Sequence, residues 1–492
     1  MSASRASYPP SMAPRGSGAV SYAVSFSRLS VDLRVRCYDT DAQDLLVSVD
    51  HRINWRLSYD RSSILVRSHV TGNDRHCSPR QRPFRPLHDK LNVYTLTAEH
   101  ILPCTITGSW PRPRWFDLSM SGRPIDSCMM DVRFREKLQD AMATVLSDQE
   151  RAGIDILTHG DLHCDDDMAG RSWHHYPLQR WAGFSGDYLQ SEETRSPWLR
   201  YPPGTLLNEI YTGWRWPRVV DKIEHRPLDY AKIWRIAQSK SAKPVRFGTC
   251  CSQVMGLFLD LHTPKYKDRH EVIWDMAVAM NTELLALRDA GCRCIQIEEP
   301  TVHFWANTYG RAHDEVKFMV ECYNREVRGL DDVELWVHTC WGNPNMQRVI
   351  ENDSYKESFE LYLDAMKGDV WTVEMKDRNM RELDLFAPLK GRLKKKICVG
   401  VVSHRTLQVE RPEDIAATIR HALQYIAPEQ LIVSSDCGFG RQGGNRDIAF
   451  FKTTAIAQGT NIVRRELGLP VTDVRAANPA LQTDIVPKTP DR

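Results

Sequence analysis

The sequence predicts an α/β protein whose largest part, residues 99–470, folds as a (β/α)8 barrel of the TIM type. Short apolar segments alternate with longer segments of helical period, an order typical of parallel strands connected by helices. Eight such units suggest a closed barrel, and nearly every apolar segment ends in a polar or metal-binding side chain. We expect a disordered N-terminal extension, residues 1–98, and a disordered C-terminal tail, residues 471–492.

The expected strands are short and apolar. In chain order they are Cys104–Ser109, Ile154–Gly160, Val245–Thr249, Cys294–Glu298, Leu335–Cys340, Trp371–Met375, Ile397–Ser403 and Leu431–Cys437. Apolar residues at helical spacing predict a helix over Phe134–Ala152, which Gly153 ends as a C-cap. The same pattern predicts a helix over His270–Ala290. Pro412 begins another helix, because a proline in the first turn loses no hydrogen bond.

The N-terminal extension differs in composition from the rest of the chain. It holds no lysine before Lys90 and no glutamate before Glu99, whereas arginine is frequent. No sustained helical or strand period emerges from it. An arginine- and serine-rich segment of this kind fits a targeting arm, a functional arm or an over-long start of the gene model, and the sequence leaves these interpretations open.

The composition is ordinary for a soluble globular protein, with 42% hydrophobic and 26% charged residues among 492. The 65 Lys and Arg nearly balance the 63 Asp and Glu, so nucleic acid is not an expected partner. The longest apolar runs are too short to span a membrane. The 13 cysteines are irregularly spaced, which favours free or metal-bound thiols in a reducing compartment. We therefore expect a cytoplasmic protein without membrane partners.

A histidine and two cysteines at expected strand ends predict a metal site. His338 and Cys340 lie two residues apart, so that on an extended chain both side chains point to one face. Cys437 ends a later strand, and Gly438 lets the backbone turn sharply beside it. One imidazole and two thiolates favour zinc, with Glu374 as a candidate fourth ligand. The alternative is a core histidine with two buried apolar cysteines.

Six motifs between Ile101 and Gly468 resemble those of the cobalamin-independent methionine synthases, in the order found in their C-terminal catalytic barrel. They are Ile106–Pro111 (ITGSWP), Leu157–Asp161 (LTHGD), Ile295–Pro300 (IQIEEP), His338–Cys340 (HTC), Val370–Glu374 (VWTVE) and Asp436–Gly438 (DCG). The resemblance implies a zinc-dependent methyltransferase that acts on a homocysteine-like small-molecule thiol and takes the methyl group from a small-molecule donor.

The resemblance also implies a role for each candidate site residue. His338, Cys340, Glu374 and Cys437 would hold the zinc, and the substrate thiol would enter as a ligand that can displace Glu374. The family's second- and fourth-strand carboxylates bind the substrate's amino group, and Asp161 and Glu298 stand at those positions. Ser109 would bind a substrate carboxylate. His404 would act as the acid that protonates the departing group.

The chain departs from the family where the folate donor binds. After Phe247–Cys251 no tryptophan follows until Trp274, although the family carries a folate-stacking tryptophan there. His303 and Phe304 replace a charged pair of the family. We therefore expect the usual polyglutamylated folate to be a poor donor.

Two other functions stay open at this point. Gly400–Leu407 is similar to the related 2-hydroxypropyl-coenzyme M lyases, so a thiol transferase acting on an epoxide is one alternative. The other is a zinc-binding accessory protein without turnover, which would bind no substrate thiol.

Overall fold

The structure is a computed structural model that describes residues 96–481 apart from 98–99, 118, 121–122, 165, 168–169, 172, 190–200, 214–215, 258, 351–353 and 441–443. Nearer the N-terminus it describes only the backbone of five strands between residues 20 and 69. The chain forms two compact units, Met1–Arg85 and Pro86–Arg492.

The strands of the first unit were not expected. β1 (Val20–Phe26) pairs antiparallel with β2 (Leu29–Val35), and β3 (Asp44–Val49), β4 (Ile53–Asp60) and β5 (Ser63–His69) form an antiparallel sheet. The sequence signal was present, because apolar and polar residues alternate along β2 and β4 with the period of a strand that packs one face. Outside these five strands, residues 1–95 lie outside the described part of the chain. The low order expected for the N-terminal extension therefore stays a prediction.

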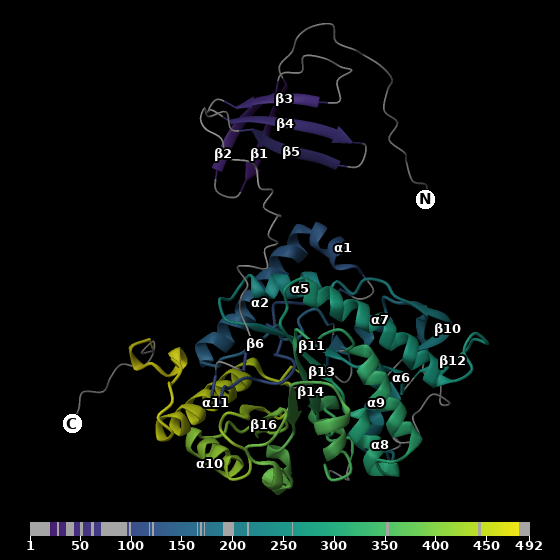
Figure 1. Cartoon of the computed structure of the whole chain (residues 1–492), viewed down its shortest axis with the longest axis vertical. Helices are drawn as coiled ribbons and strands as arrows, with labels where there is room; N and C mark the ends of the chain where they lie inside the picture. The colour runs from purple at the N-terminus through teal and green to yellow at the C-terminus, as the bar shows by residue number, and fades with distance from the viewer. Residues whose placement is uncertain are drawn as a thin grey trace, which may run out of the picture. The chain divides into compact units, whose positions relative to one another are not determined.

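The second unit contains a parallel sheet in which every pair of neighbouring strands runs in the same direction. Its strands, in spatial order, are β6 (Leu157–Thr158), β11 (Val245–Cys250), β13 (Cys294–Glu298), β14 (Glu334–Thr339), β15 (Val370–Val373), β16 (Lys396–Val402) and β17 (Leu431–Ser435). Each overlaps an expected strand, and Figure 1 shows the sheet inside a layer of helices.

The first expected strand closes the sheet into a barrel. Cys104 forms a parallel bridge with Val433 of β17, and Thr105 forms one with Ile156 next to β6, so this segment joins both edges. The Thr105 N–H donates to the carbonyl of Val433 at 2.9 Å, and the Asp155 N–H donates to the carbonyl of Cys104 at 2.9 Å. The predicted TIM-type barrel is thereby confirmed, and the carboxyl ends of its strands meet at one mouth.

The helices follow the expected alternation. They are α1 (Ile125–Met130), α2 (Val132–Ala152), α3 (His175–Leu178), α4 (Leu206–Gly213), α5 (Tyr230–Gln238), α6 (Ser252–Gly256), α7 (Arg269–Asp289), α8 (Thr301–Tyr309), α9 (Asp314–Glu326), α10 (Pro412–Leu423) and α11 (Arg446–Glu466). Asp131 caps α2 by accepting from the N–H groups of Arg133 and Phe134, and Gly153 ends it at φ 89°. The three helices predicted from periodicity and from Pro412 are thus confirmed.

An insertion between β6 and α5 was not expected. It contributes the hairpin of β7 (Asp166–Asp167) and β8 (Gly170–Arg171), and the strands β9 (Ala182–Leu189) and β10 (Trp216–Glu224), which pair antiparallel. β12 (Asp260–Leu261) adds a parallel edge to β10. Short helices replace the usual connections around β15, among them η4 (Pro344–Met346) and η6 (Lys376–Arg378).

A buried layer fills the barrel interior. Its members come from successive strands and their flanks: Leu96, Ile156, Cys294, Trp336, Val370, Cys398 and Ile432. Above it the buried guanidinium of Arg246 lies 4.3 Å from the Trp336 ring centre and donates to the carbonyl of Ile106 at 2.5 Å. The barrel is therefore a packed core rather than a channel, and chemistry is confined to its mouth.

The first part of the predicted tail lies against the barrel. The Asn461 amide donates to the carbonyl of Thr472 at 2.8 Å, and the Thr472 N–H donates back to Asn461 at 3.0 Å. Two short helices, η8 (Arg475–Ala477) and η9 (Pro479–Leu481), follow. Residues 482–492 lie outside the described part, so disorder there stays a prediction.

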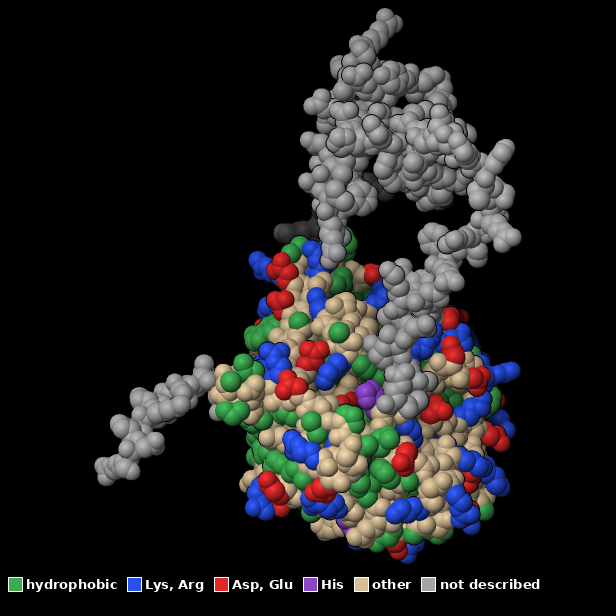
Figure 2. Space-filling view, turned by 60° about the vertical axis from the view of Figure 1, so that its left-hand side comes forward, with side chains coloured by type: hydrophobic (Ala, Val, Ile, Leu, Met, Phe, Trp, Pro, Cys, Tyr) green, Lys and Arg blue, Asp and Glu red, His purple; other side chains and the backbone are tan. Residues whose placement is uncertain are grey.

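Charges of both signs are interspersed on the face shown in Figure 2, so this face carries no basic patch of the kind that attracts nucleic acid. None of the described helices is both long and apolar enough to cross a membrane.

Candidate metal centre

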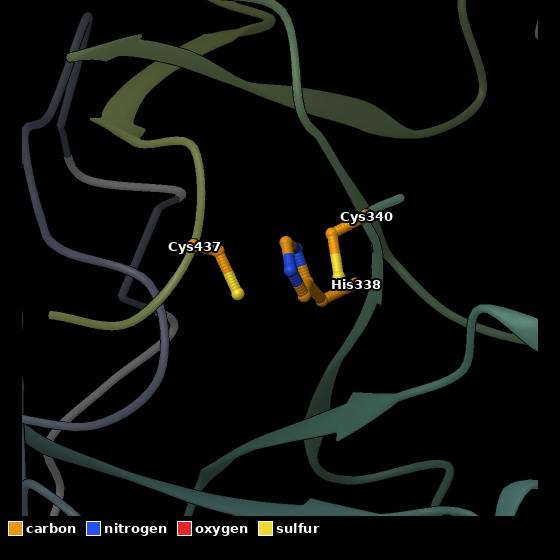
Figure 3. Close-up of side chains that lie close together, drawn as sticks. All are labelled: His338, Cys340 and Cys437. Carbon is orange, nitrogen blue, oxygen red and sulfur yellow. The ribbon is translucent and has the colours of Figure 1, made fainter. Parts of the chain in front are cut away.

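Three of the four predicted metal ligands come together at the barrel mouth. His338 lies near the end of β14, Cys340 follows that strand, and Cys437 follows β17. Their ligand atoms all lie within 4.8 Å of one another, and Figure 3 shows the three side chains converging. His338 and Cys340 share a face because they are two residues apart on extended backbone. The convergence of Cys437 upon them follows from the closure of the barrel.

Gly438 allows the Cys437 loop to pack against the loop after the first barrel strand. A Cβ atom at this position would lie 2.5 Å from the backbone nitrogen of Ser109 and 2.7 Å from its hydroxyl. The N–H groups of Phe439 and Gly440 both donate to the Ser109 carbonyl, at 2.9 and 3.0 Å. Cys437 is thus held in place by a close backbone contact that only glycine permits.

The donor set fits a soft or borderline divalent metal. All three residues are buried, and among the described residues neither ring nitrogen of His338 has a hydrogen-bond partner. A hydrogen bond from the Cys340 thiol, together with the positive charge of a protonated His338, holds the pKa of Cys437 well below its ordinary value despite burial. Buried polar atoms without partners are costly, and a metal would satisfy them. Two sulfurs and one imidazole are typical of zinc sites.

Glu374, the expected fourth ligand, does not belong to this group of described residues. It is fully buried after β15, where its carboxylate pairs with Arg405 at 2.9 and 3.1 Å and accepts from the Trp341 N–H at 2.9 Å. Arg405 was not among the residues predicted for the site. The sequence marks it only by its position directly after His404, within the Gly400–Leu407 segment that follows and overlaps β16.

Two carboxylates expected to bind a substrate ammonium lie at the same mouth. Glu298 Oε2 is 3.4 Å from His338 Nε2, and Glu298 accepts a hydrogen bond from Gln296 at 2.7 Å. Burial raises the pKa of Glu298 to about 7, and the charges of Cys437 and Asp161 act in the same direction. Asp161 Oδ1 lies 3.4 Å from His159 Nε2. Glu298 therefore lies beside His338 of the cluster, and Asp161 is close enough to Glu298 to affect its pKa.

Ser109 and His404 flank the cluster. The buried hydroxyl of Ser109 has no hydrogen-bond partner among the described groups, and it lies against the Cys437 loop. His404 Nδ1 lies 3.4 Å from Asp377 Oδ2. Burial and Arg405 lower the pKa of His404 to about 3, so the imidazole is neutral in the free site. A role as an acid requires that bound substrate raise that pKa.

Asp436 fixes the loop that follows β15. Its buried carboxylate accepts the N–H groups of Met375, Lys376 and Asp377 at 2.8, 2.8 and 2.7 Å. Asp377, His404 and Asp436 also form a compact group of their own, whose Asp377 the sequence analysis missed. Because Asp436 precedes Cys437, the Cys437 and Glu374 loops are tied together.

His303 contacts the backbone of one residue of the cluster. It is buried, and burial lowers its pKa to about 3, so the neutral ring donates from Nε2 to the carbonyl of Cys340 at 2.8 Å. We expected His303 to affect only the binding of the methyl donor. It also holds the backbone of Cys340, a predicted metal ligand.

The unexpected insertion brings two tyrosines to the mouth. The rings of Tyr201 and Tyr211 stack with centres 5.7 Å apart, and Tyr201 donates to the carbonyl of Val349 at 2.7 Å. Burial raises the pKa of Tyr211, and the charges of Tyr201 and Cys340 add to the rise. No sequence pattern marked these residues, because the insertion lacked a clear period.

Comparison with known proteins agrees with this site. Residues 232–457 match the family model described as the catalytic domain of cobalamin-independent synthase. A methionine synthase of Thermococcus kodakarensis is 30% identical over 373 residues, which cover 75% of this chain and 95% of that protein. A methionine synthase of Sulfurisphaera tokodaii is 29% identical over 375 residues, with 75% and 94% covered.

Among solved structures, the fold is similar to that of a B12-independent methionine synthase from a Shewanella species in complex with selenomethionine. The TM-score is 0.60 at 23% identity, over 75% of this chain and 99% of that one. This likeness supports the barrel fold, and the identity to the curated relatives establishes the relationship. The chain belongs to the cobalamin-independent methionine synthase family and is a methyltransferase enzyme.

Proposed function

We propose that this enzyme transfers a methyl group to the thiol of homocysteine in a zinc-dependent reaction. The observation that carries the proposal is the convergence of His338, Cys340 and Cys437 within 4.8 Å beside the carboxylates of Glu298 and Asp161. The first group suits a thiolate-activating metal, and the second suits the ammonium of an amino-acid substrate. The cytoplasmic location remains a prediction.

Zinc held by His338, Cys340 and Cys437 would keep a substrate thiol deprotonated at neutral pH. The sulfur of homocysteine then gives an electron pair to the methyl carbon. The bond between that carbon and the donor breaks, and the donor's leaving atom keeps the pair and takes up a proton. We assign delivery of that proton to His404, which is neutral in the free site and, helped by the nearby carboxylate of Asp377, would first take up the proton that the thiol releases on binding.

Asp161 and Glu298 would bind the substrate's ammonium group. Burial is the main cause of the raised pKa of Glu298, and the charge of Asp161 adds to it; an ammonium bound between the two carboxylates would offset both effects. The hydroxyl of Ser109, which has no partner among the described groups, would donate to the substrate's carboxylate. A thiol without the amino group should therefore bind more weakly.

We also propose that the usual polyglutamylated folate is a poor donor. No tryptophan lies in the segment that follows β11 up to Trp274, and His303 is buried under Cys340 rather than exposed to a donor. Loss of an aromatic stacking partner weakens a planar ligand by roughly 0.5–1.5 kcal/mol, up to about tenfold in affinity. Stacked Tyr201 and Tyr211 offer a different aromatic surface near the cluster.

Mass analysis of products tests this function. Zinc-loaded enzyme is supplied with homocysteine and, in separate reactions, with triglutamyl methylfolate, a monoglutamate, other methyl donors or an epoxide, and the Cys437→Ser variant serves as the control. We expect methionine with at least one donor and none from the variant. Formation of a thioether from an epoxide, without methionine, would instead support the thiol transferase alternative, which the relatives do not favour. If no product forms with any of these compounds, the accessory protein without turnover is the alternative that remains.

A further inference from the structure

The loop that follows Cys340 reaches across the barrel mouth to the loop that follows Cys437. The two loops leave β14 and β17, which are separated in the sheet by β15 and β16. The amide nitrogen of Asn343, in the first loop, donates to the carbonyl of Gly438, in the second, at 3.2 Å. Asn343 is only 8% exposed, so its side chain is a buried link between the loops that carry the predicted metal ligands.

The amide oxygen of Asn343 is a buried acceptor with no partner among the described groups. Turning the amide over would not satisfy it, because the oxygen would then face the Gly438 carbonyl and the two oxygens would repel each other. A buried acceptor without a partner is unfavourable, and such atoms in native proteins usually meet a ligand or a water molecule. The Asn343 oxygen is thus available to a molecule bound at the mouth.

The backbone of this loop holds Asn343 in one position. The guanidinium of Arg405 donates to the carbonyl of Gly342 at 2.7 Å and to that of Met346 at 3.3 Å. Asn345 and Met346 have φ angles of 46° and 62°, a left-handed conformation that persists only where the surrounding contacts maintain it. Strain of this kind concentrates at ligand-binding sites, which favours a functional role for the loop.

A buried acceptor requires a ligand that donates a hydrogen bond. Like the ammonium of lysine, the α-ammonium of homocysteine carries three N–H donors. Glu298 and Asp161 are its proposed partners, and with one N–H on each carboxylate the third has no acceptor among the residues assigned so far. An N–H that loses water without gaining an acceptor weakens binding, so a complete ammonium site needs one more oxygen.

Asn343 lies close to the place where homocysteine would bind. Its partner Gly438 packs against Ser109, the residue proposed to bind the substrate's carboxylate, and a Cβ atom at Gly438 would lie 2.7 Å from the Ser109 hydroxyl. The carboxylate and the ammonium of an amino acid are attached to the same carbon, so the groups that bind them must be neighbours.

We therefore propose that Asn343 is a further substrate-binding residue, whose amide oxygen accepts the third N–H of the homocysteine ammonium. The inference rests on the proposed function, since it assumes homocysteine as the substrate.

The test compares Asn343→Ala, Asn343→Asp and Asn324→Ala in the full-length zinc protein. Alanine removes both hydrogen-bonding atoms, whereas aspartate keeps an acceptor but cannot donate to Gly438. Asn324 is the control, because its amide pairs with the Ala365 carbonyl at 2.9 Å and the Lys367 N–H at 2.8 Å, before the amino end of β15 and away from the mouth. Calorimetric titration measures the affinity for homocysteine and for 4-mercaptobutanoate, which lacks the ammonium, and chelator competition measures zinc affinity.

We expect Asn343→Ala to bind homocysteine about 10- to 100-fold more weakly than wild type, because it loses a hydrogen bond to a charged group. Its affinities for 4-mercaptobutanoate and zinc should stay at the wild-type level, as should all affinities of Asn324→Ala. Asn343→Asp should recover most of the lost affinity for homocysteine. Equal losses for both thiols, or a fall in zinc affinity in both Asn343 variants, would overturn the inference and show that the amide only ties the two loops together.

The same titrations separate this inference from the proposed function. If wild type binds both thiols equally, the ammonium site of the proposed function is wrong and the inference falls with it. If wild type prefers homocysteine and Asn343→Ala keeps that preference in full, only the inference is wrong.

Discussion

The contact between Gly438 and Ser109 makes a sharp prediction for Gly438→Ala. The added methyl would lie 2.5 Å from the Ser109 backbone nitrogen and 2.7 Å from its hydroxyl, whereas carbon atoms in proteins stay beyond about 3 Å from such neighbours. The Ser109 carbonyl accepts two hydrogen bonds from the same loop, so neither backbone moves freely. Overpacking of this kind costs roughly 1–3 kcal/mol.

The added methyl should displace the backbone of Cys437, the neighbouring residue. The variant should therefore lose zinc affinity as well as stability. We expect Gly438→Ala to lower the melting temperature and to weaken zinc binding by about 10- to 100-fold. Chelator competition and thermal unfolding measure the two effects. Gly468→Ala is the matched control: its φ of 69° makes alanine unfavourable by about 1 kcal/mol, but no atom lies within 4 Å of the added methyl.

The control should therefore lose stability and keep its zinc affinity. Wild-type zinc affinity in Gly438→Ala would refute the idea that this backbone contact positions Cys437.

Further predictions concern the ligands, the N-terminal unit and a buried carboxyl. Cys340→Ser and Cys437→Ser should each lose most of their zinc in elemental analysis, and full retention in both would exclude this site. A chain that begins near Val93 should keep the melting temperature and zinc content of the full chain, and a large loss would show that the preceding residues stabilise the barrel. Burial raises the pKa of Glu326 from its ordinary 4.5 to about 8. The folded state therefore holds a proton that the unfolded state releases, and the stability from this group is full below about pH 4.5 and is lost as the pH rises through about 8. In urea unfolding, the stability of wild type relative to Glu326→Gln should fall between pH 5 and 8 by up to about 1.4 kcal/mol per pH unit, and a pH-independent difference would contradict the raised pKa.

The barrel was predictable because its strands are buried on both faces. Runs such as Ile397–Val402 and Leu431–Val433 are apolar and short, and each is followed by residues that end a strand. The strands β9 and β10 were not predicted, because Trp216–Glu224 has neither an unbroken apolar run nor a strict alternation. The strands that pair with β10, moreover, depend on how the insertion folds and not on the residue pattern within β10.

The metal cluster was predictable from spacing and strand ends, whereas its surroundings were not. His338 and Cys340 share a face on any strand, but the pairing of Glu374 with Arg405 depends on how the loops after β15 and β16 pack. An arginine after a strand usually lies in solvent, so nothing in the sequence marks Arg405 as buried. The position of Tyr211 likewise depends on how the insertion between β6 and α5 packs, which the local sequence does not reveal.

X-ray absorption at the zinc edge, recorded with and without homocysteine, tests the central claim most directly. The free enzyme should show two sulfur ligands, from Cys340 and Cys437, and nitrogen from His338. Homocysteine should add a third sulfur at a Zn–S distance of about 2.3 Å. An unchanged zinc spectrum at saturating homocysteine, or a metal site without sulfur, would contradict the account.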